Sequence, residues 1–156
     1  MTADEYDRFV MWCLRAPLSE LLSVSEDEHL CSAVHSGLWR DAPDVWRDTV
    51  GEVKLIAGAI GTIGNGGFDA ISEDGIPADP DFSRTIAALR AIGADSAAQV
   101  FSTALARIST EEAPDLQTHL DALSTSWFEE KGTVYRLLAR HIRSNADRIL
   151  TLAGTV

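Results

Sequence analysis

The chain has 156 residues, enough for one domain with a sizeable core, and 46% of them are hydrophobic, which excludes wholesale disorder. Its 24 acidic residues against 13 lysines and arginines give a formal net charge of −11. Direct binding to nucleic acid is therefore disfavoured, because phosphate contacts need lysine and arginine, whereas a basic protein is electrostatically favoured as a partner.

The acidity is uneven along the chain. Residues 1–100 hold 17 acidic and 7 basic residues, and residues 101–156 hold 7 and 6. No apolar run approaches the roughly 20 residues needed to span a bilayer, and the acidic N-terminus is unlike a secretory signal. We therefore expect a cytoplasmic protein with no membrane partner. Two cysteines, Cys13 and Cys31, are too few for a disulfide framework and predict two buried thiols.

Helical periodicity begins at the first residues. Thr2 and Glu5 form a capping-box pattern ahead of an apolar helical face. Ser25 and Glu28 repeat this pattern before a short helix that Gly37 can end.

A longer helix is predicted to open at Asp41 and Pro43 and to close at Gly61 and Gly64. Its apolar spacing is typical of one buried helical face. The residues of this stripe are Trp46, Thr49, Val50, Val53, Ile56, Ala57 and Ile60.

A loop at Asn65–Phe68 and an acidic segment at 69–81 follow this helix. A helix from Phe82 is then predicted to end with Gly93 as its C′ residue, and Asp95 to cap the next helix. The short connection between the two predicts a helical hairpin.

The last part of the chain predicts two more helices. The first starts at Pro114, with Leu116, Leu120, Leu123 and Trp127 facing inward. Gly132 breaks it, and Thr133 caps the last helix, whose outer face carries Arg136, Arg140 and Arg143. The prediction is one all-α domain over residues 1–156, with about six or seven helices.

Catalytic signatures were not found in the sequence. It contains no G-x-S-x-G and no H-E-x-x-H, and its glycine-rich stretch lacks the lysine of a phosphate-binding loop. Cys31 and His35 would share a helical face as two metal ligands, but His29, His119 and His141 are the only other histidines, and zinc needs a third ligand and usually a fourth. The 69–81 segment lacks the ligand order of a calcium loop. We therefore expect no catalytic residue, no metal and no cofactor.

Two motifs point to a family. Gly64–Phe68 reads G-N-G-G-F, and Ala87–Ala94 reads A-A-L-R-A-I-G-A. This pair resembles the N-N-G-G-F and A-L-x-x-I-G-A elements of a bacterial helical family of unknown function. That family includes a DNA-mimic protein that antagonises a transcription repressor and a histone-like protein. The similarity covers about residues 45–145. It implies a helical domain and a regulator that binds a nucleic-acid-binding protein.

The loop itself has two interpretations. As a structural junction, Asn65, Gly66 and Gly67 supply backbone angles closed to other residues, and Phe68 anchors the turn in the core. As a ligand site, the N–H groups of the two glycines would form an anion-binding nest. The junction is favoured, since no cation and no acid–base pair lies near the loop in the sequence.

The function that the sequence favours is an acidic protein-binding domain, a DNA-mimic-like regulator that binds a basic or DNA-binding protein. Its candidate surface consists of Asp69, Glu73, Asp74, Asp79, Asp81, Asp41, Asp44 and Asp48, with Glu26, Asp27 and Glu28 as further candidates.

Three other interpretations remain open. An immunity or antitoxin-like protein would use the same charge against a basic toxin. A small-molecule binder or enzyme would use the Asn65–Phe68 loop, with a polar pocket beside it. The arginines of the last helix, set against an acidic remainder, suggest a homodimer, although they would pair equally well with acids of their own chain.

Overall fold

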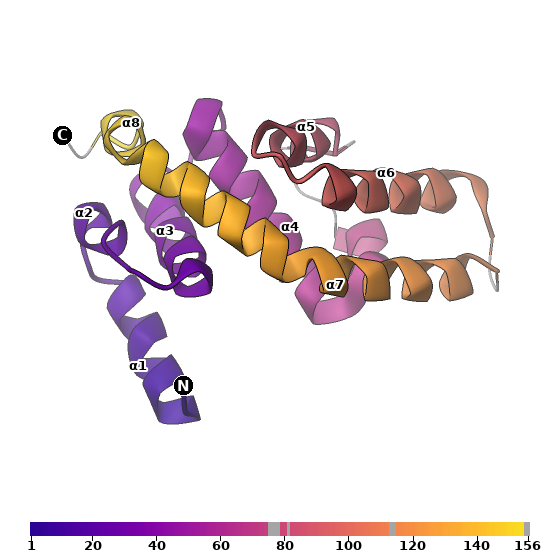
Figure 1. Cartoon of the computed structure of the whole chain (residues 1–156), viewed down its shortest axis with the longest axis horizontal. Helices are drawn as coiled ribbons and strands as arrows, with labels where there is room; N and C mark the ends of the chain where they lie inside the picture. Colours follow the sequence, from indigo (N-terminus) through magenta and orange to yellow (C-terminus); the bar gives the residue numbers. More distant parts are fainter. Residues whose placement is uncertain (75–78, 81, 113–114, 155–156) are drawn as a thin grey trace. The chain divides into compact units, whose positions relative to one another are not determined.

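The computed structural model describes residues 1–74, 79–80, 82–112 and 115–154, with the side chains of 72–74 outside the description. The all-α prediction is confirmed: the described residues form eight helices and no strand (Figure 1). None of these helices is long and apolar enough to cross a membrane. The helices are α1 (Ala3–Cys13), α2 (Leu18–Leu21), α3 (Asp27–Asp41), α4 (Asp48–Asp74), α5 (Ser83–Ala91), α6 (Asp95–Thr110), α7 (Asp115–Ser144) and α8 (Ala146–Leu152).

The chain divides into two compact units. Unit 1 comprises Met1–Lys54 and Leu138–Val156, and unit 2 comprises Leu55–Leu137. The boundaries fall inside α4 and α7, so each of these helices contributes residues to both units. The prediction of a single domain over 1–156 stays a prediction.

In unit 1, α3 packs against both α1 and α2. Its core is aliphatic, with Leu18, Leu21, Leu30 and Leu38 fully buried. Both cysteines are free and buried, as predicted.

A buried lysine organises the loop ahead of α4. The Lys54 Nζ donates to the carbonyl oxygens of Ala42, Pro43 and Val45 at 3.0, 2.8 and 3.3 Å. Its ammonium also lies 4.1 Å from the centroid of the Trp46 ring. An ammonium has three N–H donors, so every donor is satisfied although the side chain is only 1% exposed.

The core of unit 2 is aromatic. Phe68, Phe101 and Trp127 form a triangle whose ring centroids are 5.7, 6.0 and 5.9 Å apart. Phe82 adds a fourth ring, 5.6 Å from Phe101. These tilted and edge-to-face geometries are the favourable ones for aromatic pairs, and the cluster joins residues from α4, α6 and α7.

Of the helix N-caps predicted at Thr2, Ser25 and Asp95, one is confirmed and two are wrong. The Thr2–Glu5 capping box is confirmed, with both reciprocal bonds present. The Ser25 cap is wrong: Glu26 is the N-cap of α3, and its Oε2 accepts from the His29 N–H at 2.7 Å. Asp95 is the first residue of α6 and not its cap, and there its carboxylate is favourable for the helix dipole.

The predicted ends of the long helices are wrong. α4 begins at Asp48, not at Asp41 and Pro43, because the chain before it is folded onto Lys54. α4 continues through Gly61 and Gly64, which the sequence predicted to close it. Each mid-helix glycine costs only about 1 kcal/mol relative to alanine, less than the neighbouring buried isoleucines contribute.

α7 also continues where a break was predicted. It runs unbroken for 30 residues through Gly132 and Thr133. Val134 and Leu138, two and six residues after Gly132, are fully buried. Their burial outweighs the weak helix propensity of one glycine.

Candidate protein-binding site

The Asn65–Phe68 loop is a kink within α4. Gly66 (φ −149°, ψ 16°) and Gly67 (φ 65°, ψ −162°) leave the helical conformation, and the helix resumes at Phe68. Asn65, by contrast, lies in the helix and is exposed. The kink therefore joins two helical segments and does not end the helix.

The kink is hydrogen-bonded to α7. The Phe68 N–H donates to Ser124 Oγ at 3.0 Å, and the Ser124 hydroxyl donates to the Leu120 carbonyl at 2.8 Å. A Cβ added at Gly67 would lie 2.8 Å from Ser124 Oγ. Position 67 thus requires glycine twice, for its backbone angles and for this close approach.

Just beyond the kink, one amide connects two carboxylates. Gln117 Nε2 donates to Asp69 Oδ2 at 2.7 Å and to Asp121 Oδ1 at 3.1 Å. Gln117 and Asp121 lie one turn apart on α7, and Asp69 belongs to the end of α4. The kink therefore positions a carboxylate beside those of α7.

The exposed face of α7 is acidic from Asp115 to Glu129, ahead of Arg136 on the same side of the helix. Asp115, Asp121 and Glu129 are exposed and fall within a sector of about 120° around the helix, while Leu120 and Trp127 face the opposite side. Within the described part of the chain, no lysine, arginine or histidine lies within 4.0 Å of these three carboxylates. We call Asp115, Asp121 and Glu129 the acidic α7 face.

Two of the acids predicted from the sequence in unit 1 are neutralised by arginines. Asp41 pairs with Arg40 through two bonds of 2.6 and 2.7 Å. Asp48 pairs with Arg148, and the hydrogen bond from this guanidinium is the main cause that lowers the pKa of Asp48. Asp44 is exposed and lines a surface hollow of about 460 Å³ formed by residues 44–47.

Asp79 is not a surface residue, so its assignment to the acidic surface is wrong. Its side chain is 1% exposed. Its two carboxylate oxygens accept from the backbone N–H groups of Arg84 and Thr85 at 3.1 and 2.6 Å. The residue therefore caps the first turn of α5, where free N–H groups favour a carboxylate. The side chains of Glu73 and Asp74, and the whole of Asp81, lie outside the described residues, so nothing bears on these assignments.

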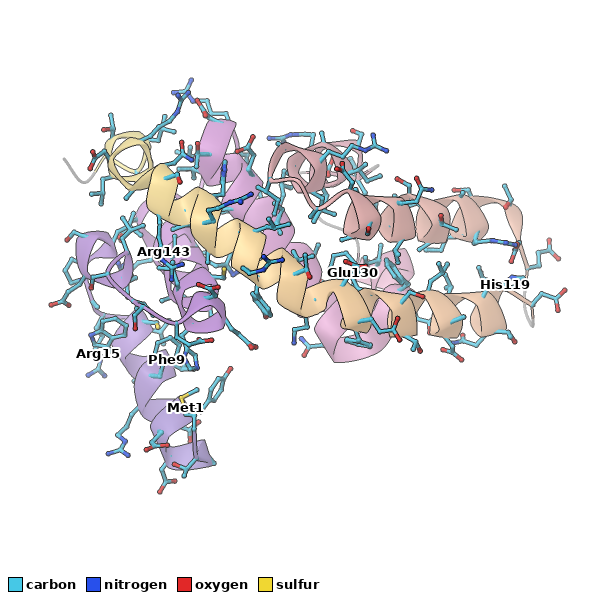
Figure 2. The ribbon with its side chains drawn as sticks, in the orientation of Figure 1. Met1, Phe9, Arg15, His119, Glu130 and Arg143 are labelled. Atoms are coloured by element: carbon cyan, nitrogen blue, oxygen red, sulfur yellow. The ribbon has the colours of Figure 1, made fainter. Side chains whose placement is uncertain are left out.

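Further acids near the start of α3 also have local roles. Glu26 caps α3 and also contacts His29, with Nδ1 and Oε2 2.8 Å apart. Asp27 accepts from Arg143 at 2.7 Å (Figure 2). Glu28 is exposed. Arg143 of α7 thus pairs with an acid of its own chain, one of the two arrangements that the sequence left open.

The histidines take part in pairs. The Trp39 indole N–H donates to His35 Nε2 at 2.7 Å, and burial lowers the pKa of His35 to about 4. His119 lies 2.6 Å from Glu111, and His141 lies 2.9 Å from Glu52, measured between the ring nitrogen and a carboxylate oxygen. His119 is near the first turns of α7 (Figure 2).

The geometry around Cys31 does not favour thiolate chemistry. Burial is the main cause that raises the pKa of Cys31 to about 12, so the thiol stays protonated at neutral pH. Among the described residues, no group of three or more histidine, cysteine, aspartate or glutamate side chains is arranged to hold a metal ion.

The acidic α7 face was missed in the sequence, although a signal for it was present. Leu116, Leu120, Leu123 and Trp127 were predicted to face inward, and helical periodicity places Asp115, Asp121 and Glu129 opposite them. The net charge, which is most negative over residues 1–100, points to a different part of the chain.

The family of this chain follows from comparison with known proteins. The family model described as "DMP19-like protein" matches residues 50–148, more than half of the chain. The chain therefore belongs to the DMP19-like family, and the acidic α7 face and the kink both lie in the matched segment. No curated protein and no solved structure matches the chain.

Proposed function

We propose that this member of the DMP19-like family is a binding module that docks a basic, nucleic-acid-binding protein on the acidic α7 face. The observation that carries the proposal is the set of three exposed carboxylates, Asp115, Asp121 and Glu129, with no cation of the described residues in salt-bridge range. Asp69, connected to Asp121 through Gln117, extends this surface beside the kink.

The charge of unit 2 supports the same proposal. Unit 2 contains 12 acidic and 5 basic residues, whereas unit 1 contains 12 and 8. An excess of negative charge accelerates encounters with a basic surface. Because salt screens exposed charges over about 10 Å at 0.1 M, binding of this kind weakens steeply as salt is added.

Mimicry of DNA is the finer form of the proposal, and spacing limits how literal it is. At 1.5 Å per residue, the acidic α7 face extends about 21 Å from Asp115 to Glu129. Duplex DNA presents one phosphate per ~1.7 Å of axis, or about twelve over the same length. Three carboxylates reach only about a quarter of that density. We therefore propose that the module competes with nucleic acid through net charge, without copying individual phosphate positions.

An immunity or antitoxin-like role belongs to the same binding class, since a basic toxin would bind the same carboxylates. The identity of the partner separates the two roles. We place the protein in the cytoplasm in either case, where its partner would meet nucleic acid.

Binding is proposed in preference to catalysis because the kink is occupied by structural contacts. The Phe68 N–H is bonded to Ser124, and the Gly67 backbone lies close to the same hydroxyl. The hollow at residues 44–47 belongs to unit 1, whereas the kink belongs to unit 2.

Affinity capture from the host lysate tests the proposal. The bait is the full chain, compared at low and high salt with a variant carrying Asp115→Asn, Asp121→Asn and Glu129→Gln. We expect the wild type to retain a basic nucleic-acid-binding protein at low salt, and the variant to retain much less of it. Equal recovery by both baits, or recovery of no basic protein, would contradict the proposal.

A matched control separates this face from general acidity. Glu20→Gln, Asp95→Asn and Asp147→Asn change the net charge by the same amount at exposed acids of α2, α6 and α8. This control should retain the partner as the wild type does. Circular dichroism of both variants establishes that the helices are intact.

A further inference from the structure

Exposed apolar side chains are concentrated at the start of the chain. The described residues include eight large hydrophobic side chains that are exposed, and six of them lie within the first 14 residues. These six are Met1, Tyr6, Val10, Met11, Trp12 and Leu14. Over the rest of the described chain, only Trp39 and Phe128 are of this kind. An apolar surface gathered in this way indicates an interaction site.

α1 is held to α3 by one side only. Cys13 is its buried residue, and its carbonyl accepts from Arg40 Nη1 at 3.3 Å. The Phe9 ring lies 4.9 Å from the His29 ring, measured between centroids (Figure 2). Both contacts lie on one side of α1 and leave its neighbouring face uncovered.

The uncovered face carries a regular stripe. Tyr6, Val10 and Leu14 recur every fourth residue, and Leu14, the C-cap, keeps helical backbone angles (φ −71°, ψ −14°). Successive members are rotated by about 40°, so the three form one slightly inclined ridge. They are 55%, 37% and 54% exposed. We call these three residues the α1 ridge.

The length of α1 makes a covering partner physically reasonable. Isolated helices shorter than about 12–15 residues are marginal in water, and α1 has 11 residues. Most helical stability in proteins comes from packing of an apolar face. The α1 ridge offers such a face, and the described residues of unit 1 leave it exposed.

We propose that the α1 ridge pairs with the α1 ridge of a second copy of this chain, in antiparallel orientation. Asp4, Glu5 and Asp7 make the first half of α1 acidic, and Arg8 and Arg15 are the only lysine or arginine residues among the first 39. A parallel pair would set the acidic halves against each other. An antiparallel pair centred on Val10 brings Arg15 of each copy toward the acidic half of the other.

This pairing is self-complementary, as a twofold interface requires. With the two Val10 side chains at the twofold axis, Tyr6 of each copy packs against Leu14 of the other copy. The matched family segment begins at residue 50, so α1 lies outside it and the proposed dimer is a feature of this chain's own N-terminal helix. The proposal does not depend on the acidic α7 face.

Sedimentation equilibrium of the full chain tests the proposal from nanomolar to high micromolar concentration. We expect a mass that rises from 16.9 kDa to twice that value. Val10→Asp places two like charges at the twofold axis and should raise the dimer dissociation constant at least about tenfold. Phe128→Ser, which removes an exposed aromatic from α7, should leave it unchanged.

A second arm tests the charge argument with reversed variants. Arg8→Glu with Arg15→Glu makes α1 uniformly acidic, and Asp4→Lys with Asp7→Lys makes it basic. Each variant alone should remain monomeric at concentrations where the wild type is dimeric, and the two mixed should form a heterodimer. A monomer at every concentration, or a dimer insensitive to Val10→Asp, would overturn the proposal. The wild-type chain could instead stay monomeric while Val10→Asp captures less of the basic protein from the lysate. That result would assign the α1 ridge to a different partner and would also overturn the proposal.

Discussion

At the scale of single residues, the kink depends on Gly67. Its φ of 65° and ψ of −162° fall in a region that is essentially open to glycine alone, and a Cβ there would meet Ser124 Oγ at 2.8 Å. Asn65 does not share this requirement, since it is helical and exposed. The motif thus contains Gly67, where only glycine fits, and Phe68, which packs in the core, whereas Asn65 meets no such requirement.

Gly67→Ala is therefore expected to lower the free energy of unfolding by about 1–3 kcal/mol, and by more if Ser124 cannot move. Gly64→Ala is the matched control, because Gly64 is helical and has no atom within 4 Å of an added Cβ. That change should stabilise the chain by about 0.5–1 kcal/mol. Urea unfolding followed by circular dichroism measures both. A neutral Gly67→Ala would refute the kink as described.

His35 should make stability depend on pH. Burial lowers its folded pKa from 6.5 to about 4, so between these pH values the unfolded chain binds a proton that the folded chain does not. Stability contributed by the neutral imidazole is therefore present above about pH 6.5 and is lost as pH falls toward 4. The loss is on the order of 2–3 kcal/mol.

His35→Gln isolates this effect, because a glutamine oxygen can accept the Trp39 indole N–H and does not titrate. The difference in unfolding free energy between pH 7 and pH 4 should be smaller for the variant than for the wild type. Carboxylates contribute to both proteins alike, so the comparison cancels them. Equal pH dependence in the two proteins would show that His35 is not shielded from protonation.

At the scale of elements, α7 is one continuous helix where the sequence predicted two helices separated at Gly132. Gly132 is helical and exposed, and an added Cβ would have no atom within 4 Å. Gly132→Ala should therefore stabilise the chain by about 0.5–1 kcal/mol, measured as a shift of the urea midpoint. Gly93→Ala is the contrasting variant: φ is 84° there, and the change should cost about 1 kcal/mol. Destabilisation by Gly132→Ala would indicate a break in α7.

Gly93 and Gly132 show how far helix ends could be predicted. Gly93 was predicted as a C′ residue, and this is confirmed: its N–H donates to the Arg90 carbonyl, and the Ala94 N–H donates to the Leu89 carbonyl, at 2.9 and 2.8 Å. These two bonds form a Schellman motif, which is specified by local residues. At Gly132 the local sequence looks similar, and burial of side chains further along decides the outcome. Tertiary packing of this kind is not visible in the local pattern.

At the scale of the whole chain, the net charge could be read from the composition, but the carboxylates of the proposed binding face could not. Asp79 is a buried helix cap, and Asp41 and Asp48 pair with arginines. The contacts of Asp79 and Asp48 join residues that are five or more positions apart in the sequence. The acidic α7 face became recognisable once the inner face of that helix was fixed by Leu120 and Trp127. The all-α class and the family were predictable from periodicity and motif. The proposed binding face could not be predicted, because it depends on which carboxylates have no nearby cation in the folded chain.

The most direct test of the central claim is a competition between this protein and duplex DNA for the captured basic partner. Fluorescence anisotropy of labelled DNA bound to that partner reports displacement as the protein is added. We expect displacement at low salt that weakens steeply with added salt. The Asp115→Asn, Asp121→Asn and Glu129→Gln variant should need roughly 3- to 150-fold more protein, since each of the three lost pairs contributes roughly 0.2–1 kcal/mol. The Glu20→Gln, Asp95→Asn and Asp147→Asn control should match the wild type. Displacement that is absent, or equal for both variants, would contradict the account.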